Sequence, residues 1–150
     1  MGLCFSCFYT QQDLKSVPFF TFDGYKTRGT VVYIYDGDTV HIVLPLKETK
    51  QMVKIKTRLD GIDTPELRVQ EQKIKALAAK ARLIEILKET YNVVQVECGK
   101  FDKYGRVLVT LYSSKYEKSI NQMLIDEGHA YEYHGKTKQK FTQNIHLKDE

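Results

Sequence analysis

The sequence predicts an α+β fold that is mainly β: a five-stranded Greek-key barrel, with a long helix between the third and fourth strands and a short helix near the C-terminus. Two observations predict this fold. Runs of β-branched and aromatic residues recur along the chain at strand length, and a long and a short helical pattern follow the third and the fifth run. A length of 150 residues is typical of one domain with one hydrophobic core.

The first three strands are expected at residues 30–35, 39–46 and 51–59. Asp36-Gly37 stands between the first two runs and is a strong hairpin signal, because these residues readily adopt a tight turn. The third run alternates between apolar and basic residues, which is the pattern of a half-buried strand. These features predict a hairpin followed by a third strand.

A long helix is expected from about Leu67 to Thr90, because apolar residues recur there at spacings of three and four. Thr64 and Pro65 just before it are typical of a helix entry, with Thr64 as the N-cap. The apolar stripe of this helix is expected to comprise Ile74, Leu77, Ala81, Ile84 and Leu87.

Two further strands are expected at 92–98 and 106–112. Ser119 and Gln122 have the spacing of a capping box, which predicts that a short helix begins there, and Gly128 is expected to end it. The order of three strands, a helix, two strands and a helix is that of an OB-fold barrel. This fold is a common platform for binding nucleic acids and oligosaccharides.

The composition favours a globular protein over a disordered one, with 42% hydrophobic residues, ten Tyr and seven Phe. The net charge of +4 is compatible with a polyanionic partner, but many ordinary domains carry as much. No apolar run reaches about 18 residues, so no membrane-spanning helix is expected. Cys98 lies in an alternating apolar run and is expected to be buried.

Three polar clusters fall at comparable places in this topology, at residues 35–39, 57–66 and 102–106. Each has an ordinary explanation in turn chemistry, since Asp, Gly, Thr and Pro are frequent turn residues. The combination of acids and arginines in all three is harder to explain by turns alone. It indicates a charged functional site.

Asp38 and Asp63 are short carboxylates on turns, which suits a hard cation such as calcium. Arg58 and Arg106 stand beside them, and arginine grips phosphate with a planar fork that is always charged. A metal ion and guanidinium groups together neutralise the charge that develops on phosphoryl oxygens during phosphodiester cleavage. Glu66 is then a candidate to act on the attacking water.

The motifs DGDT at 36–39, R-x-x-G-I-D-T-P-E at 58–66 and DKYGR at 102–106 occur in this order along the chain. Together they resemble the signature of the staphylococcal nuclease, or thermonuclease-like, family, and the resemblance runs from about Lys26 to Ala130. It implies an OB-fold endonuclease that uses Ca²⁺ to cut DNA and RNA and leaves 3′-phosphate ends.

The resemblance also implies a role for each matching residue. For the Ca²⁺ ion, it implies carboxylate ligands from Asp38 and Asp63, a backbone carbonyl ligand from Thr64 and an acidic residue behind the ion, Asp36. For the substrate, it implies that Arg58 and Arg106 contact the scissile phosphate and that Lys103 and Tyr104 contact the bound nucleotide. Glu66 is implied to orient or deprotonate the attacking water. The chain departs from the family in two places. The segment after Glu66 is shorter than the family's lysine-rich loop, and the stretch after Gly128 leads to a polar end where the family usually continues into tyrosines and a further helix. Either Tyr131 or Tyr133 is expected to flank the substrate or to pack on the barrel.

The main alternative is a non-catalytic OB-fold module that binds single-stranded nucleic acid through a basic groove and stacking aromatic residues. Degenerate members of the family have lost acids or arginines, whereas this chain has every matched charged position. The sequence therefore favours a nuclease, expected to act on DNA and/or RNA as a monomer.

Residues 1–20 are expected to form a tail ahead of a single thermonuclease-like domain at 21–150. The tail lacks a charged n-region followed by a long apolar stretch, so it is not typical of a secretory signal. Its C-x-x-C sequence is also compatible with redox or zinc chemistry, although no second cysteine pair accompanies it.

The start of the chain fits the N-myristoylation pattern, with Gly2 exposed after removal of the first methionine and Ser6 at the preferred position. Cys4 and Cys7 lie close by and offer sites for a palmitoyl chain. One myristoyl chain holds a protein at a membrane only marginally, whereas two acyl chains hold it stably. The tail therefore predicts a membrane-associated protein that faces the cytosol, the alternative being an unmodified, unstructured start.

Overall fold

A closed five-stranded barrel forms the body of the protein in the computed structural model, which describes residues 11–135. The barrel strands are β1 (Lys26–Ile34), β2 (Thr39–Pro45), β3 (Met52–Leu59), β5 (Val93–Phe101) and β6 (Val107–Tyr112). They follow one another in the order β1-β2-β3-β6-β5, and β5 closes the barrel by pairing with β1. All pairings are antiparallel except that of β3 with β6, as in an OB-fold. The predicted fold is confirmed.

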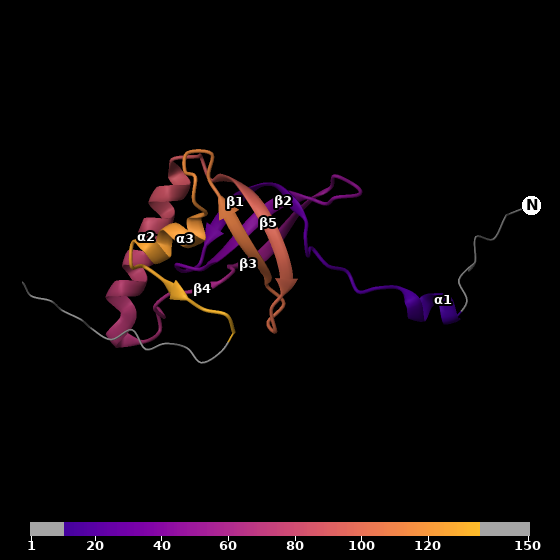
Figure 1. The fold of residues 1–150 in the computed structure, drawn as a ribbon, viewed down its shortest axis with the longest axis horizontal. Coiled ribbons are helices and arrows are strands. Elements are labelled where there is room, and N and C mark those ends of the chain that lie inside the picture. The colour runs from indigo at the N-terminus through magenta and orange to yellow at the C-terminus, as the bar shows by residue number, and fades with distance from the viewer. Residues whose placement is uncertain (1–10, 136–150) are drawn as a thin grey trace, which may run out of the picture.

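Two helices lie together at one side of the barrel, α2 (Lys73–Lys88) and α3 (Ile120–Asp126) (Figure 1). A short 3₁₀ turn, η1 (Gln70–Gln72), leads into α2. The helix α1 (Gln11–Ser16) lies away from the barrel at the end of an extended stretch (Figure 1). No helix in residues 11–135 combines the length and the apolar character needed to cross a membrane.

Two very short strands, β4 (Ile62–Asp63) and β7 (Tyr131–Glu132), pair with each other beside the barrel. They join the chain just after β3 to the chain just after α3. Neither is visible as a sequence pattern, because two residues show no alternation. This pairing matters for the site, since Asp63 stands opposite Tyr131 in it.

The core fills the barrel with the apolar side chains that alternate inward from its strands and with the inner face of the helices. Cys98 belongs to this core and is 5% exposed, as predicted. Burial raises the pKa of its thiol to about 11, so Cys98 is a small apolar core residue and not a reactive thiol.

The long helix begins later than predicted, at Lys73 and not at about Leu67. The residues before it form turns in place of a helix: Val69 N donates to Glu66 O at 3.2 Å, and Gln72 N donates to Val69 O at 3.0 Å. The proposal that Thr64 caps the helix is therefore wrong.

The predicted apolar stripe of α2 is also wrong for most of its members. Ile74 is 84% exposed and Leu77 is 50% exposed. The buried face instead comprises Ala76, Ala79, Leu83, Ile86 and Leu87. Ala79 is small where Gly37 of the β1–β2 hairpin packs on the helix, since a Cβ at position 37 would lie only 2.9 Å from Ala79 Cβ.

The short helix α3 is capped at its start by Ser119, whose Oγ accepts from Gln122 N at 3.1 Å. The other half of the predicted capping box is absent, because the Gln122 side chain donates to Asp126 at 2.8 Å. The helix ends before Gly128, which has a φ of +75° that favours glycine, as predicted.

Candidate active site

The β1–β2 hairpin turns Asp38 into the protein. Asp36 Oδ1 accepts hydrogen bonds from the backbone N–H groups of Asp38 (3.1 Å) and Thr39 (2.8 Å), which fixes the turn. Asp38 is 3% exposed, and its Oδ1 accepts from Thr39 Oγ1 at 2.9 Å. The acidic residue expected behind the ion, Asp36, thus acts on Asp38 through the backbone of the turn.

Position 37 of this hairpin has no space for a side chain, so it requires glycine. A Cβ at this position would lie 2.9 Å from Thr64 Cγ2 and 2.9 Å from Ala79 Cβ. The hairpin therefore packs directly on the loop after β4 and on helix α2. Any side chain at position 37 would push Asp38 away from its partners.

Arg58, at the end of β3, joins the two predicted metal carboxylates. Its Nη1 lies 2.7 Å from Asp38 Oδ2, and its Nη2 lies 2.6 Å from Asp63 Oδ1. All three side chains are buried, with exposed fractions of 14% for Arg58 and 4% for each aspartate. Nη2 also donates to the carbonyl of Ile62 at 3.1 Å. The three predicted residues thus form one buried cluster.

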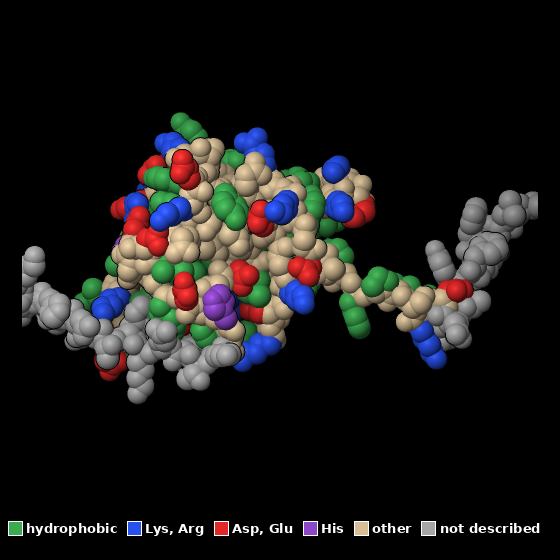
Figure 2. All heavy atoms as spheres, viewed as in Figure 1, with side chains coloured by type: hydrophobic (Ala, Val, Ile, Leu, Met, Phe, Trp, Pro, Cys, Tyr) green, Lys and Arg blue, Asp and Glu red, His purple; other side chains and the backbone are tan. Residues whose placement is uncertain are grey.

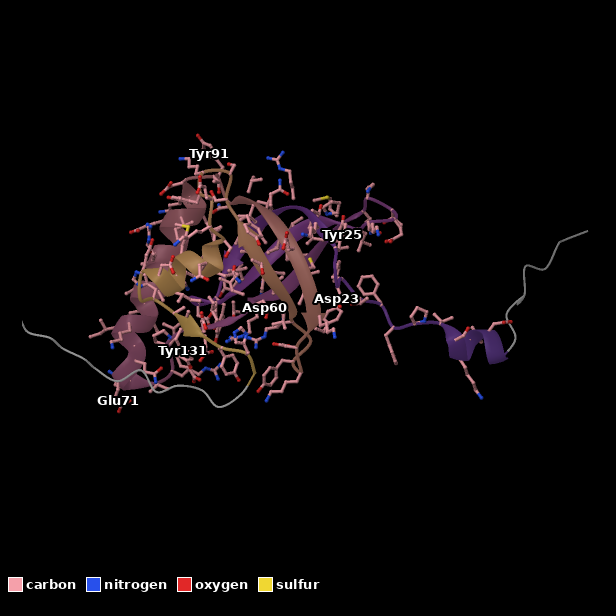
Figure 3. All side chains as sticks on the ribbon, viewed as in Figure 1. Asp23, Tyr25, Asp60, Glu71, Tyr91 and Tyr131 are labelled. Atoms are coloured by element: carbon pink, nitrogen blue, oxygen red, sulfur yellow. The ribbon has the colours of Figure 1, made fainter. Side chains whose placement is uncertain are left out.

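The β4–β7 pair completes the surroundings of Asp63. Tyr131 stands opposite Asp63 in the register, and its hydroxyl donates to Asp63 Oδ2 at 2.6 Å. Figure 3 shows Tyr131 on β7 at the side of the barrel. Tyr133 N donates to Gly61 O at 2.9 Å and extends the contact. The sequence predicts that one of these tyrosines flanks the substrate or packs on the barrel, and it does not predict the bond to Asp63.

Thr64 follows Asp63 directly and is 4% exposed. Its backbone N–H donates to Asp38 Oδ2 at 3.3 Å, so the loop after β4 is tied to the β1–β2 hairpin. Thr64 therefore lies beside both carboxylates with which it was predicted to act.

The cluster holds more negative than positive charge. Within residues 11–135, Asp36, Asp38 and Asp63 lie close to Arg58, which pairs with Asp38 and Asp63. Burial, together with the charges of Asp36 and Asp63, raises the pKa of Asp38 to about 6, although Arg58 lowers it. A further cation beside these carboxylates would complete the charge balance.

The donor set fits calcium. Calcium prefers oxygen ligands, and Asp38, Asp63 and the Thr64 carbonyl supply only oxygen. Within residues 11–135, no three His, Cys, Asp or Glu side chains converge closely enough to hold an ion by themselves. Calcium takes six to eight ligands, so the protein would supply part of the shell and water or a phosphate the rest.

Arg106 is held at the turn between β5 and β6 by Asp102. The Asp102 Oδ1 atom accepts from the backbone N–H groups of Tyr104 (2.8 Å) and Arg106 (2.9 Å), and Oδ2 accepts from Arg106 Nε at 2.7 Å. Arg106 Nη1 donates to Thr39 Oγ1 at 3.3 Å, and Thr39 in turn bonds Asp38. A chain of hydrogen bonds thus joins Arg106 to the buried cluster. Asp102 was not predicted as a site residue, although it opens the DKYGR motif.

The two predicted nucleotide contacts stand at the tip of the same turn. Tyr104 is exposed, with Lys103 Nζ 5.0 Å and Arg106 Cζ 5.4 Å from its ring centroid. Both distances are typical of cation–π contacts. The turn therefore presents an aromatic ring and two cations to solvent beside the cluster.

Glu66 lies in the loop between β4 and α2, three residues after Asp63, and is exposed. Its backbone N–H donates to Gln72 Oε1 at 2.9 Å, which positions the loop backbone. The predicted lipidation sites, Gly2, Cys4 and Cys7, lie outside the described residues.

The barrel and the charged cluster at its loops define an OB-fold protein with a candidate site for a cation and a phosphate. Residues 56–150, well over half of the chain, match the family described as staphylococcal nuclease homologue, and the protein belongs to this family. The family is generally one of nucleases and is typically calcium-dependent. The β1–β2 hairpin with Asp38 precedes the matched residues. The search of curated proteins found no match.

Proposed function

We propose that this protein is a calcium-dependent endonuclease that hydrolyses phosphodiester bonds of DNA and/or RNA and leaves 3′-phosphate ends. The observation that carries the proposal is the buried cluster in which Arg58 contacts both Asp38 and Asp63, with Arg106 joined to it through Thr39. A purely binding module has no need of two buried carboxylates, because a polyanion is repelled by them.

Asp38, Asp63 and the Thr64 carbonyl are proposed to hold Ca²⁺. The bound ion would supply positive charge to a phosphoryl oxygen of the substrate. Nε of Arg58 and Nη2 of Arg106 have no protein partner within residues 11–135, so both guanidinium groups have donors for the phosphate. They would stabilise the charge that grows on its oxygens in the transition state.

Glu66 is proposed to orient the attacking water and to accept its proton. The water oxygen bonds to phosphorus while the bond from phosphorus to the 5′ oxygen breaks, and the departing 5′ oxygen takes a proton from solvent water. The products are a 3′-phosphate and a 5′-hydroxyl. Lys103 and Tyr104 are proposed to contact the nucleotide next to this phosphate, because their turn also carries Arg106.

The test is cleavage of single-stranded DNA and of RNA by purified protein, with calcium and with chelator. We expect cleavage only with calcium and products whose 3′ ends are removed by a phosphatase. Arg106→Ala should lower turnover by at least roughly 10²-fold, the usual effect of losing one transition-state donor. Lys115→Ala, which removes one positive charge from the loop between β6 and α3, is the control. Binding without cleavage at any calcium concentration would favour the single-strand-binding module.

We further propose that the protein is anchored to a membrane, facing the cytosol, through a myristoyl chain on Gly2 and a palmitoyl chain on Cys4 or Cys7. Support comes from the sequence pattern and from the described residues that follow it. Hydrophobic side chains line the extended stretch between α1 and the barrel (Figure 2). The exposed ones are Val17, Phe19 and Phe20, and Leu14 on α1 is exposed as well.

Cell fractionation tests the anchor. The wild type should sediment with membranes, and Gly2→Ala should move to the soluble fraction because a single remaining acyl chain would hold the protein only marginally. Equal recovery of both proteins in the soluble fraction would remove the anchor and leave the nuclease proposal untouched.

A further inference from the structure

Three adjacent strands of the barrel carry basic side chains and no acidic ones. Strands β1, β2 and β3 lie side by side (Figure 1) and contain no Asp or Glu. Their basic residues are Lys26, Arg28, Lys54, Lys56 and Arg58. The whole chain is nearly balanced, with 23 basic and 19 acidic residues, whereas these three strands carry five basic residues and no acidic one. Lys26 and Arg58 form ion pairs with acids of other elements.

Lys54 and Lys56 form a line of cations that leads to the candidate active site. Both are exposed and lie on the same side of β3 as Arg58, while Ile55 and Thr57 turn inward. Alternate residues of a strand are about 6.7 Å apart, so the two amines follow Arg58 at regular steps. Neither lysine forms an ion pair with any residue of the described chain. Their charges are therefore available to a ligand.

An aromatic pair lies beside these lysines because of a β-bulge in β1. The register shifts between Val31 and Tyr33, so Tyr33 stands opposite His41 and points outward, 51% exposed. Without the bulge, Tyr33 would face inward like Val31, two residues before it. The rings of Tyr33 and His41 are 5.0 Å apart, and His41 pairs with Lys56 across the β2–β3 ladder. Bulges often redirect side chains next to active sites.

The same surface reaches the second arginine of the site. Arg106 directly precedes β6, and the first residue of β6, Val107, pairs with Thr57, the neighbour of Lys56. Lys56, two residues before Arg58 on β3, thus lies next to the turn that carries Arg106. We call Tyr33, His41, Lys54 and Lys56 the β3 surface.

We propose that the β3 surface binds the strand of single-stranded nucleic acid that extends from the scissile phosphate. This inference rests on the proposed function for the position of that phosphate. The lysines would contact successive phosphates, and the Tyr33–His41 pair would stack on an adjacent base. A base face is available for stacking only where the strand is unpaired, so the surface selects single strands over duplexes.

Binding is measured by fluorescence anisotropy with labelled DNA and RNA single strands of two and of ten nucleotides and with the matching ten-base-pair duplex, in chelator so that cleavage does not interfere. The double variant Lys54→Ala/Lys56→Ala is compared with the control Lys88→Ala/Lys118→Ala, which removes the same charge from α2 and from the loop before α3. Tyr33→Ala is compared with Tyr33→Phe, which keeps the ring. The DNA and RNA arms show whether the surface distinguishes the two sugars.

We expect the double variant to bind the ten-nucleotide strand more weakly, with a smaller loss for the two-nucleotide strand. Two lost phosphate contacts reduce the slope of log affinity against log salt by about 1.4. When the salt is lowered from 200 to 50 mM, the affinity of both proteins rises, and the factor of that rise should be roughly sevenfold smaller for the variant than for the wild type. Tyr33→Ala should weaken binding by about fivefold or more, whereas Tyr33→Phe should stay close to the wild type.

A double variant whose affinity and salt slope match those of the control would overturn the inference. So would equal losses on duplex and single strand, which would make the lysines a general polyanion contact. The two proposals fail separately. If the double variant loses binding but the wild type never cleaves, the enzyme proposal alone is wrong, and cleavage by the wild type with unchanged binding by the variant removes only the β3 surface.

Discussion

Arg58 is predicted to hold the site together before any ion binds. Replacing it with alanine leaves Asp38 and Asp63 buried and facing each other without their shared cation. Breaking a buried ion pair by removing one partner typically costs about 3–5 kcal/mol, because the remaining charge is left uncompensated. For a chain of this length each kcal/mol lowers the melting temperature by about 2–4 °C, so Arg58→Ala should melt roughly 6–20 °C below the wild type.

The assay is thermal unfolding followed by circular dichroism, in chelator. Lys118→Ala is the matched control, because Lys118 pairs with Asp126 at the same 2.6 Å but with side chains 66% and 38% exposed. Exposed pairs contribute only about 0–1 kcal/mol, so this variant should melt close to the wild type. Asp38→Asn should restore part of the stability lost by Arg58→Ala, since it removes one of the two facing charges. Calcium should also restore part of it.

A loss of less than about 1 kcal/mol in Arg58→Ala would refute this reasoning, since it would mean that the two carboxylates do not depend on Arg58. The same conclusion would follow if Asp38→Asn destabilised the Arg58→Ala background further. Either result would mean that residues other than Arg58 stabilise the two buried carboxylates.

Three further predictions concern the residues around the cluster. Glu66→Gln should slow cleavage by roughly 10²-fold or more, because the amide cannot accept the proton of the attacking water. The affinity for nucleotide in chelator should stay nearly unchanged, and a parallel loss of affinity would contradict this role. Gly37→Ala should destabilise the protein by about 1–3 kcal/mol and raise the calcium concentration needed for cleavage, since the new Cβ would lie 2.9 Å from two neighbouring atoms. Unchanged unfolding in urea would contradict this, because it would mean that the hairpin moves aside without cost. Burial alone would raise the pKa of Asp102, but hydrogen bonds from Arg106 and Tyr104 hold it below its ordinary value. The stability that Asp102 contributes is therefore present above about pH 4 and is lost as the pH falls through its folded pKa, so the stability difference between wild type and Asp102→Asn should shrink below pH 4 in urea titrations.

Local patterns predicted the barrel well and the helix poorly, for physical reasons. Strand β3 shows strict alternation because one face lies on the core and the other in water, and the structure keeps that division. Helix α2 misleads because Ala76 and Ala79 face the barrel, where space is short, while the larger Ile74 and Leu77 stay outside. A pattern of side-chain size cannot show how closely two backbones approach.

For the site, too, local motifs were predicted correctly and contacts between distant segments were not. The residues that are close in sequence to a motif, such as Asp63 and Thr64, were predicted, and the structure brings them to Asp38 and Arg58. The bond from Tyr131 to Asp63 depends on a two-residue strand pair between segments far apart in the chain. No local pattern encodes such a pair, because its stability comes from the packing of the whole domain.

The outward position of Tyr33 was equally hidden. Alternation along β1 places this ring on the inner face, and only the bulge after Val31 turns it outward. A bulge depends on how two strands pair, which the sequence of one strand does not specify.

The measurement that tests the central claim most directly is the cleavage rate of a single-stranded substrate as a function of calcium concentration, for the wild type and for Asp38→Ala. We predict that the wild type is inactive in chelator and reaches a plateau with calcium. Asp38→Ala should need a much higher calcium concentration and recover part of that plateau rate, because it has lost one of its proposed ligands. Cleavage that persists undiminished in chelator, or identical calcium curves for the two proteins, would contradict the account.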